Sequence, residues 1–274
     1  MSIARTRLGR DVAALALASI IALFASTAYA EEDPWPGLQR GLFGDRAIAA
    51  EDGMVVLDAP QTADDPALVP VTVRVPPSVT IGLKSMTLVI DKNPTPVVAS
   101  FTFGPAAGVG GERFLSTRVR FESFSHVRAI LETEDGTLHM ATKFVQAAGG
   151  CAAMDAKDPD VEAEGLGKMI VKTFEPALSS APLWSAQVML KHPNSNGMQL
   201  NLNTGILIAP RFVDEMTVTR AGELVLKMTN GGGSISANPY FRFSFGRGGD
   251  NDLDIAITDT SGTVFSGRSV PSGS

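Results

Sequence analysis

The stretch "STRVRFES", residues 116–123, alternates its side chains with a period of two. Thr117, Val119 and Phe121 fall on one side of an extended chain, and charged residues fall on the other. The stretch "KSMTLVIDK", residues 84–92, alternates in the same way. This pattern is typical of β-strands that bury one face.

Other stretches of the chain show the same alternation of apolar and polar residues. Residues 127–133 and 138–145 flank an Asp135-Gly136 turn and read as a hairpin. A short helix is expected within Trp35–Ala50. Further strands are expected at 71–75, 97–103, 185–193, 214–228, 240–246 and 252–267. Many short strands separated by Pro and Gly turns predict an all-β protein built from β-sandwiches.

A change of composition divides the chain. Residues 154–168 are acidic, rich in Ala and Gly, and lack sustained periodicity, so they read as a flexible linker that extends to Pro182. We therefore expect two β-sandwich domains joined by a flexible linker. Their expected bounds are 1–30 for a signal peptide, 31–147 for the first sandwich, 148–182 for the Cys-bearing segment and linker, and 183–270 for the second sandwich.

The N-terminus has the parts of a secretory signal. Arginines at 5, 7 and 10 precede the apolar run Val12–Ala25, and Ala28-Tyr29-Ala30 supplies small residues for cleavage after Ala30. An uncleaved anchor is the alternative, but the run is shorter than the roughly 20 residues a spanning helix needs. We expect an exported, periplasmic protein.

The charge of the chain excludes some partners. The formal net charge is −6, and removal of residues 1–30, with three Arg and one Asp, makes it −8. No basic patch is visible, which argues against binding to nucleic acid or to an anionic membrane surface.

The chain has one cysteine, Cys151, within "FVQAAGGCAAMDAKD", residues 144–158. A lone Cys in an exported protein is either buried in a core, paired between chains, or reactive. Gly149 and Gly150 precede it and polar residues follow, so we expect an exposed loop with the glycines as a hinge. No cationic neighbour in sequence would lower the pKa of the thiol.

Other catalytic patterns are missing from the sequence. His126, His139 and His192 lack metal-ligand spacing, although His126 and His139 could meet across the predicted hairpin. A Cys–His pair formed by folding stays open as a possibility. We expect no metal and no cofactor.

Longer stretches resemble a known family. "VQAAGGCAA" is similar to the Cys-bearing tail of SoxY, a carrier of sulfur intermediates in bacterial thiosulfate oxidation. The second half resembles SoxZ, its companion, in the stretches "KHPNSNGMQ", "APRFVDEMTVTRAGELV", "NPYFRFSF" and "DLDIAITDTSGTVFSG". The whole chain looks like the fused SoxYZ-like carriers associated with quinoprotein dehydrogenases.

The resemblance implies immunoglobulin-like sandwiches and a carrier function, with no catalysis by the chain itself. Cys151 would be the covalent attachment site for a sulfur species presented to partner enzymes, and Gly149 and Gly150 match the glycines before it. Ala152 and Ala153 depart from the family pattern, which has glycines there. Two alternatives remain: an accessory module that docks on a quinoprotein dehydrogenase without thiol chemistry, and an enzyme with Cys151 as nucleophile.

Overall fold

The computed structural model describes residues 33–152, 164–178, 180–201, 203–249 and 251–271. The predicted signal peptide, residues 1–30, and residues 154–163 of the predicted linker lie outside these ranges. Within the described part of the chain, no helix is long and apolar enough to cross a membrane. Residues 35–274 cluster as one unit, and the description below concerns that unit.

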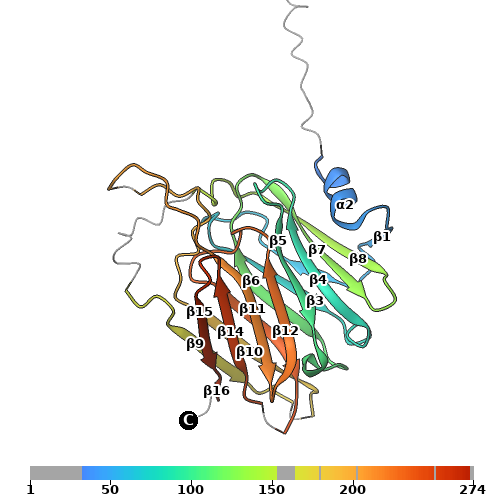
Figure 1. The fold of residues 1–274 in the computed structure, drawn as a ribbon. Helices are drawn as coiled ribbons and strands as arrows, with labels where there is room; N and C mark the ends of the chain where they lie inside the picture. The colour runs from blue at the N-terminus through green and yellow to red at the C-terminus, as the bar shows by residue number, and fades with distance from the viewer. Residues whose placement is uncertain (1–32, 153–163, 179, 202, 250, 272–274) are drawn as a thin grey trace, which may run out of the picture. The chain divides into compact units, whose positions relative to one another are not determined.

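Strands dominate this unit and form two sheets (Figure 1). The larger sheet contains β1 (Ile48–Ala50), β4 (Leu83–Ile90), β5 (Val97–Phe103), β7 (Ser125–Thr133), β8 (Leu138–Val145), β11 (Val213–Arg220), β12 (Glu223–Asn230), β14 (Asp254–Asp259) and β15 (Val264–Arg268). The smaller sheet contains β2 (Val56–Asp58), β3 (Val69–Val75), β6 (Arg113–Val119), β9 (Met169–Phe174), β10 (Leu183–Leu190), β13 (Tyr240–Gly246) and β16 (Val270–Pro271). The helical elements are α2 (Trp35–Phe43) and the 3-10 turn η1 (Pro105–Ala107). The predicted all-β sandwich fold is confirmed.

The period of two decides which face of each strand is buried. In β3, alternate valines from Val69 to Val75 are buried, and in β6 the inward positions include Leu115 and Val119. β4 departs from strict alternation because Val89, predicted to face outward, is fully buried. Trp35 of α2 packs in the same cluster as Val89, so the helix covers this part of the outer face.

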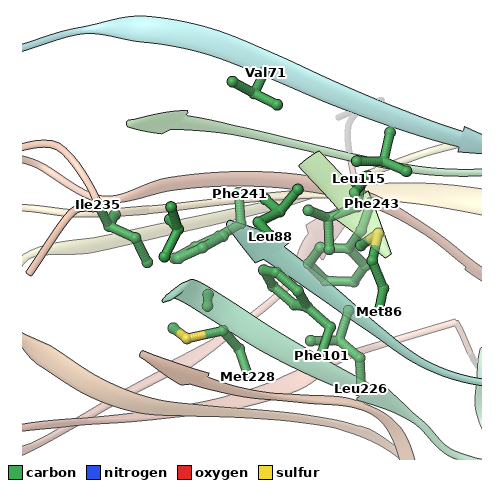
Figure 2. Close-up of a cluster of buried hydrophobic side chains, with 14 of the residues drawn as sticks. Val71, Met86, Leu88, Phe101, Leu115, Leu226, Met228, Ile235, Phe241 and Phe243 are labelled. Atoms are coloured by element: carbon green, nitrogen blue, oxygen red, sulfur yellow. The ribbon is translucent and has the colours of Figure 1, made fainter. Parts of the chain in front are cut away.

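The two halves of the chain share one hydrophobic core. Figure 2 shows Met86 and Phe101 from the first half beside Leu226 and Phe243 from the second. Each of these side chains is at most 2% exposed. Burial of this extent is the main favourable contribution to folding, at about 25 cal/mol per Å² of apolar surface.

Both sheets run continuously across the two halves. β5 pairs with β12, from Phe103 opposite Leu226 to Ala99 opposite Asn230. β6 pairs with β13, with Thr117 opposite Phe241. The order in the larger sheet is β1-β8-β7-β4-β5-β12-β11-β14-β15, and in the smaller sheet β16-β9-β10-β13-β6-β3-β2. The two halves are thus joined edge to edge in each sheet. This pairing forms hydrogen bonds along strand edges whose backbone groups would otherwise have no strand partner.

One segment assigned to the linker is a strand. Residues 169–174 form β9, which pairs antiparallel with β10. Its pattern was weak in sequence because only Val171 and Thr173 turn inward. The short helix expected within residues 35–50 is confirmed as α2, which ends at Phe43, and residues 48–50 form β1 beside β8.

Candidate functional site

Cys151 is buried, with 1% of its surface exposed, so the prediction of an exposed loop was wrong. The glycines before it explain the difference. Gly150 donates its N–H to the Phe121 carbonyl at 2.7 Å, and Gly149 donates to the Glu122 carbonyl at 2.9 Å. The turn therefore lies directly on the chain that follows β6.

Each glycine has a separate conformational or steric reason to be there. A Cβ on residue 150 would collide with the carbonyl oxygen of Pro66. Gly149 adopts a φ of +83°, which residues with side chains rarely tolerate, although open space surrounds it. The sequence suggested that the paired glycines make this segment flexible and exposed. In the structure, the lack of a side chain on Gly150 allows its backbone to lie close to that of Pro66.

Side chains from both halves of the chain hold the backbone of Cys151. Its N–H donates to Oε2 of Glu122 at 3.1 Å, and its carbonyl accepts a hydrogen bond from Nε2 of Gln199 at 3.0 Å. Gln199 is itself buried and is oriented by the Asn196 N–H, which donates to its side-chain oxygen. We call Glu122 and Gln199 the clamp residues.

The surroundings of the thiol keep it protonated. Burial and, to a smaller extent, the Glu122 carboxylate raise the pKa of Cys151 to about 11, and the Arg120 guanidinium opposes both effects. At neutral pH the thiolate fraction is therefore on the order of one in 10⁴. The Cys151 thiol is thus shielded and weakly nucleophilic in this arrangement.

The contacts described for the three histidines are with residues other than Cys151. His126 and His139 do not meet across the hairpin, because His126 lies opposite Phe144 and His139 lies opposite Leu131. His126 packs edge-on against Phe144, and His139 pairs with Asp52.

His192 is fully buried in a network of its own. Its Nε2 lies 3.3 Å from Oδ2 of Asp259, and its Nδ1 accepts the Asn194 N–H at 3.0 Å. Asp259 also accepts hydrogen bonds from Arg211 and Ser261. These contacts fit a structural role. In the described ranges, no group of three or more His, Cys, Asp or Glu side chains is placed to hold a metal ion.

Sequence reasoning missed the clamp residues and Pro66. Glu122 was visible as an outward charge in the stretch 116–123, and Gln199 closes the stretch "KHPNSNGMQ". Neither pattern indicated contact with Cys151, because both contacts depend on how distant segments meet.

Fold and site together define a β-sandwich protein in which a single thiol is clamped where two halves of the chain meet. Residues 39–151 match the family model described as sulfur oxidation protein SoxY, and residues 175–270 match sulphur oxidation protein SoxZ. The chain thus carries a SoxY domain in its N-terminal half and a SoxZ domain in its C-terminal half.

One solved structure to which the chain is similar is that of the sulfur carrier protein SoxY from Chlorobium limicola f thiosulfatophilum. It is 24% identical, with a TM-score of 0.34, and the alignment covers 42% of this chain and 91% of that one. Comparison with curated proteins gives no match.

Proposed function

We propose that this chain is a periplasmic carrier that holds a sulfur species covalently on Cys151 and presents it to partner enzymes. The observation that carries the proposal is the position of Cys151. It is the only cysteine in the chain, and it is the last residue of the SoxY match. The sequence pattern of residues 1–30 supports export, and a quinoprotein dehydrogenase is the partner that the sequence resemblance favours.

The attached species in this proposal is of the thiosulfate or sulfane type. Joining the Cys151 sulfur to the outer sulfur of thiosulfate forms one S–S bond and releases the thiol proton together with two electrons. A separate electron-accepting partner enzyme takes these electrons, and the proton leaves to solvent. This chain supplies the thiol and its shelter, and the partner supplies the oxidant.

Loading and unloading require that the thiol leave its buried position. Gly149 and Gly150 are the proposed hinge, since a turn here can change conformation without moving a bulky side chain. Opening breaks the two backbone hydrogen bonds of the glycines and the two bonds to the clamp residues. A docking partner would compensate for these lost bonds and bring the thiol into reach.

Intact-mass measurement tests the carrier proposal. Full-length protein purified from the periplasm without reductant should carry a mass excess of a sulfur adduct on Cys151, which reductant removes. Cys151→Ser should lack the excess and lose activity in an assay with the partner enzyme. Protein that carries no adduct after incubation with partner and thiosulfate would contradict the proposal.

A second candidate function is favoured by the burial of the thiol. A non-catalytic module that docks on a quinoprotein dehydrogenase would need no accessible cysteine, and the raised pKa of Cys151 is compatible with that role. In this case Cys151→Ser would keep full partner-dependent activity. The same assay therefore separates the two functions.

A further inference from the structure

A second site begins at the first residue of β6. Arg113 occupies an inward position of this strand, in phase with Leu115 and Val119, and only 3% of it is exposed. An arginine charge at such a position is costly unless a counter-charge or a full set of acceptors surrounds it. The surroundings of Arg113 supply only part of that compensation.

The contacts of Arg113 leave much of the guanidinium unsatisfied. Nη2 donates to the carbonyls of Ala107 and Gly108, and the guanidinium lies 4.6 Å from the centre of the Phe103 ring. Nε and Nη1 are buried and have no hydrogen-bond partner. Burial lowers the pKa of Arg113 to about 10, so the group is still charged at neutral pH.

Another buried arginine shows what a satisfied site looks like. Arg128 donates Nε and Nη2 to both oxygens of the Asp91 carboxylate at 2.7–3.0 Å and also lies over the ring of Trp35. Within the described ranges, no carboxylate forms an ion pair with Arg113. Its charge therefore lacks the counter-ion that Arg128 has.

Arg113 also lines a pocket. The cavity, of about 270 Å³, lies between the loop at residues 80–83, the end of β5 and the η1 turn. Its apolar lining includes Ile81 and Val109, which are 70% and 52% exposed. Glu134 is the other charged side chain in the lining, and it is exposed. Small-molecule sites usually combine apolar side chains with a few polar groups that fix the orientation of the ligand.

We infer that this pocket binds a small organic anion, with its carboxylate or sulfonate group directed to Arg113 and its apolar body against Ile81 and Val109. The anion would supply the counter-charge that the chain does not. Glu134 opposes anion entry, so its charge weakens binding. The site is separate from Cys151. Arg113 begins β6, whose other end lies roughly 20 Å away at the rise of an extended chain, and the Cys151 turn docks beyond that end. The inference does not rest on the carrier function.

Binding of hexanoate, hexanesulfonate and hexanol by the full mature protein tests the site. We expect saturable shifts in the amide NMR signals of residues 80–83 and 103–113 with at least one of the two anions. Hexanol, which has the same body without the charge, should bind at least about tenfold more weakly. The hexanoate and hexanesulfonate titrations show which headgroup is preferred, and inorganic sulfate shows whether the apolar body matters. Cys151→Ser should bind the anions as the wild type does.

Variants locate the charge that attracts the ligand. Arg113→Gln should abolish anion binding, and Glu134→Gln should strengthen it. Because Arg113→Gln alters a buried residue, Ile81→Asp serves as a second test at an exposed rim position and should weaken binding several-fold without affecting the fold. Equal binding of hexanol and the anions, sulfate binding as tight as theirs, absence of saturable shifts, or unchanged affinity in both Glu134→Gln and Ile81→Asp would overturn the inference.

Discussion

At the scale of single residues, the thiol and its glycines show how one sequence feature can have opposite structural meanings. Small residues around Cys151 predicted exposure. In the structure the absence of a side chain on Gly150 allows the turn to contact the Pro66 backbone, and this contact buries Cys151. Pro66 and Gln199 are distant in sequence from the turn, so local pattern could not reveal either neighbour.

The raised pKa of Cys151 predicts an unusual pH profile for its reactivity. Because its folded pKa is about 11, the labelling rate of native protein by a disulfide reagent should keep rising above pH 9. In urea-denatured protein the rate should level off near the ordinary thiol pKa of about 8.5. A native rate that levels off at the same pH as the denatured protein would show that Cys151 is not shielded.

Gln199 should control how often the thiol becomes accessible. Gln199→Ala removes the hydrogen bond to the Cys151 carbonyl, worth about 0.5–1.5 kcal/mol, and should speed labelling of native protein about 3- to 10-fold. Gln187→Ala is the matched control, since Gln187 lies on β10 and its side-chain amide contacts only Met189 among the hydrogen bonds described. Equal labelling rates in the two variants would count against a clamp.

At the scale of elements, α2 acts as a cover for the larger sheet. Trp35 packs on Val89 and Ile130, with the Arg128 guanidinium 4.2 Å from its ring. Trp35→Ala should lower the free energy of unfolding by about 3 kcal/mol, because the cavity cannot close fully. Leu42→Ala, at a position 41% exposed on the same helix, should change it by no more than about 0.5 kcal/mol. Urea titration followed by far-UV circular dichroism measures both.

The network between β10 and β14 should make stability depend on pH. Burial lowers the pKa of His192, although Asp259 opposes this shift, so the folded protein holds the ring neutral while the unfolded chain takes up a proton below about pH 6.5. Protonation at Nδ1 would also break the bond from the Asn194 N–H. The contribution of His192 to stability is therefore present above pH 6.5 and is lost as pH falls toward 5.

Urea midpoints at about pH 7.5 and pH 5 measure this dependence. His192→Gln should reduce the loss of stability between the two values. His126→Gln, at a histidine whose side chain is 44% exposed, is the matched control substitution. An equal loss in wild type and His192→Gln would remove His192 as the cause.

At the scale of the whole molecule, alternation predicted most strands and the sandwich class, because burial of one strand face leaves a direct mark in sequence. The hairpin of β7 and β8 was predicted and is confirmed, whereas the pairing of strands across the two halves was beyond reach. The stretch "YFRFSFG" contains no pattern that indicates pairing of β13 with β6. The inward pattern of β9 is short and follows an acidic stretch, so it did not indicate a strand. Cys151 could be proposed as the attachment site from sequence, whereas its burial and its clamp residues depend on long-range contacts.

The shared sheets predict one unfolding transition. β5–β12 and β6–β13 pairing and a common core couple the halves, so neither half should unfold while the other stays native. Differential scanning calorimetry of the mature protein should give a single peak, with a calorimetric enthalpy equal to the van't Hoff value. Two resolved peaks would mean that the SoxY and SoxZ halves are independent.

The edge-to-edge joint also sets the order in which the protein can be completed. Phe103 meets Leu226 and Thr117 meets Phe241, partners that are 123 and 124 positions apart along the chain. During synthesis the first half therefore emerges with the edges of β5 and β6 unpaired. Contacts over such separations form slowly, and bare strand edges recruit other chains. Until β12 and β13 have been synthesised, the edges of β5 and β6 that they cover in the native protein remain exposed.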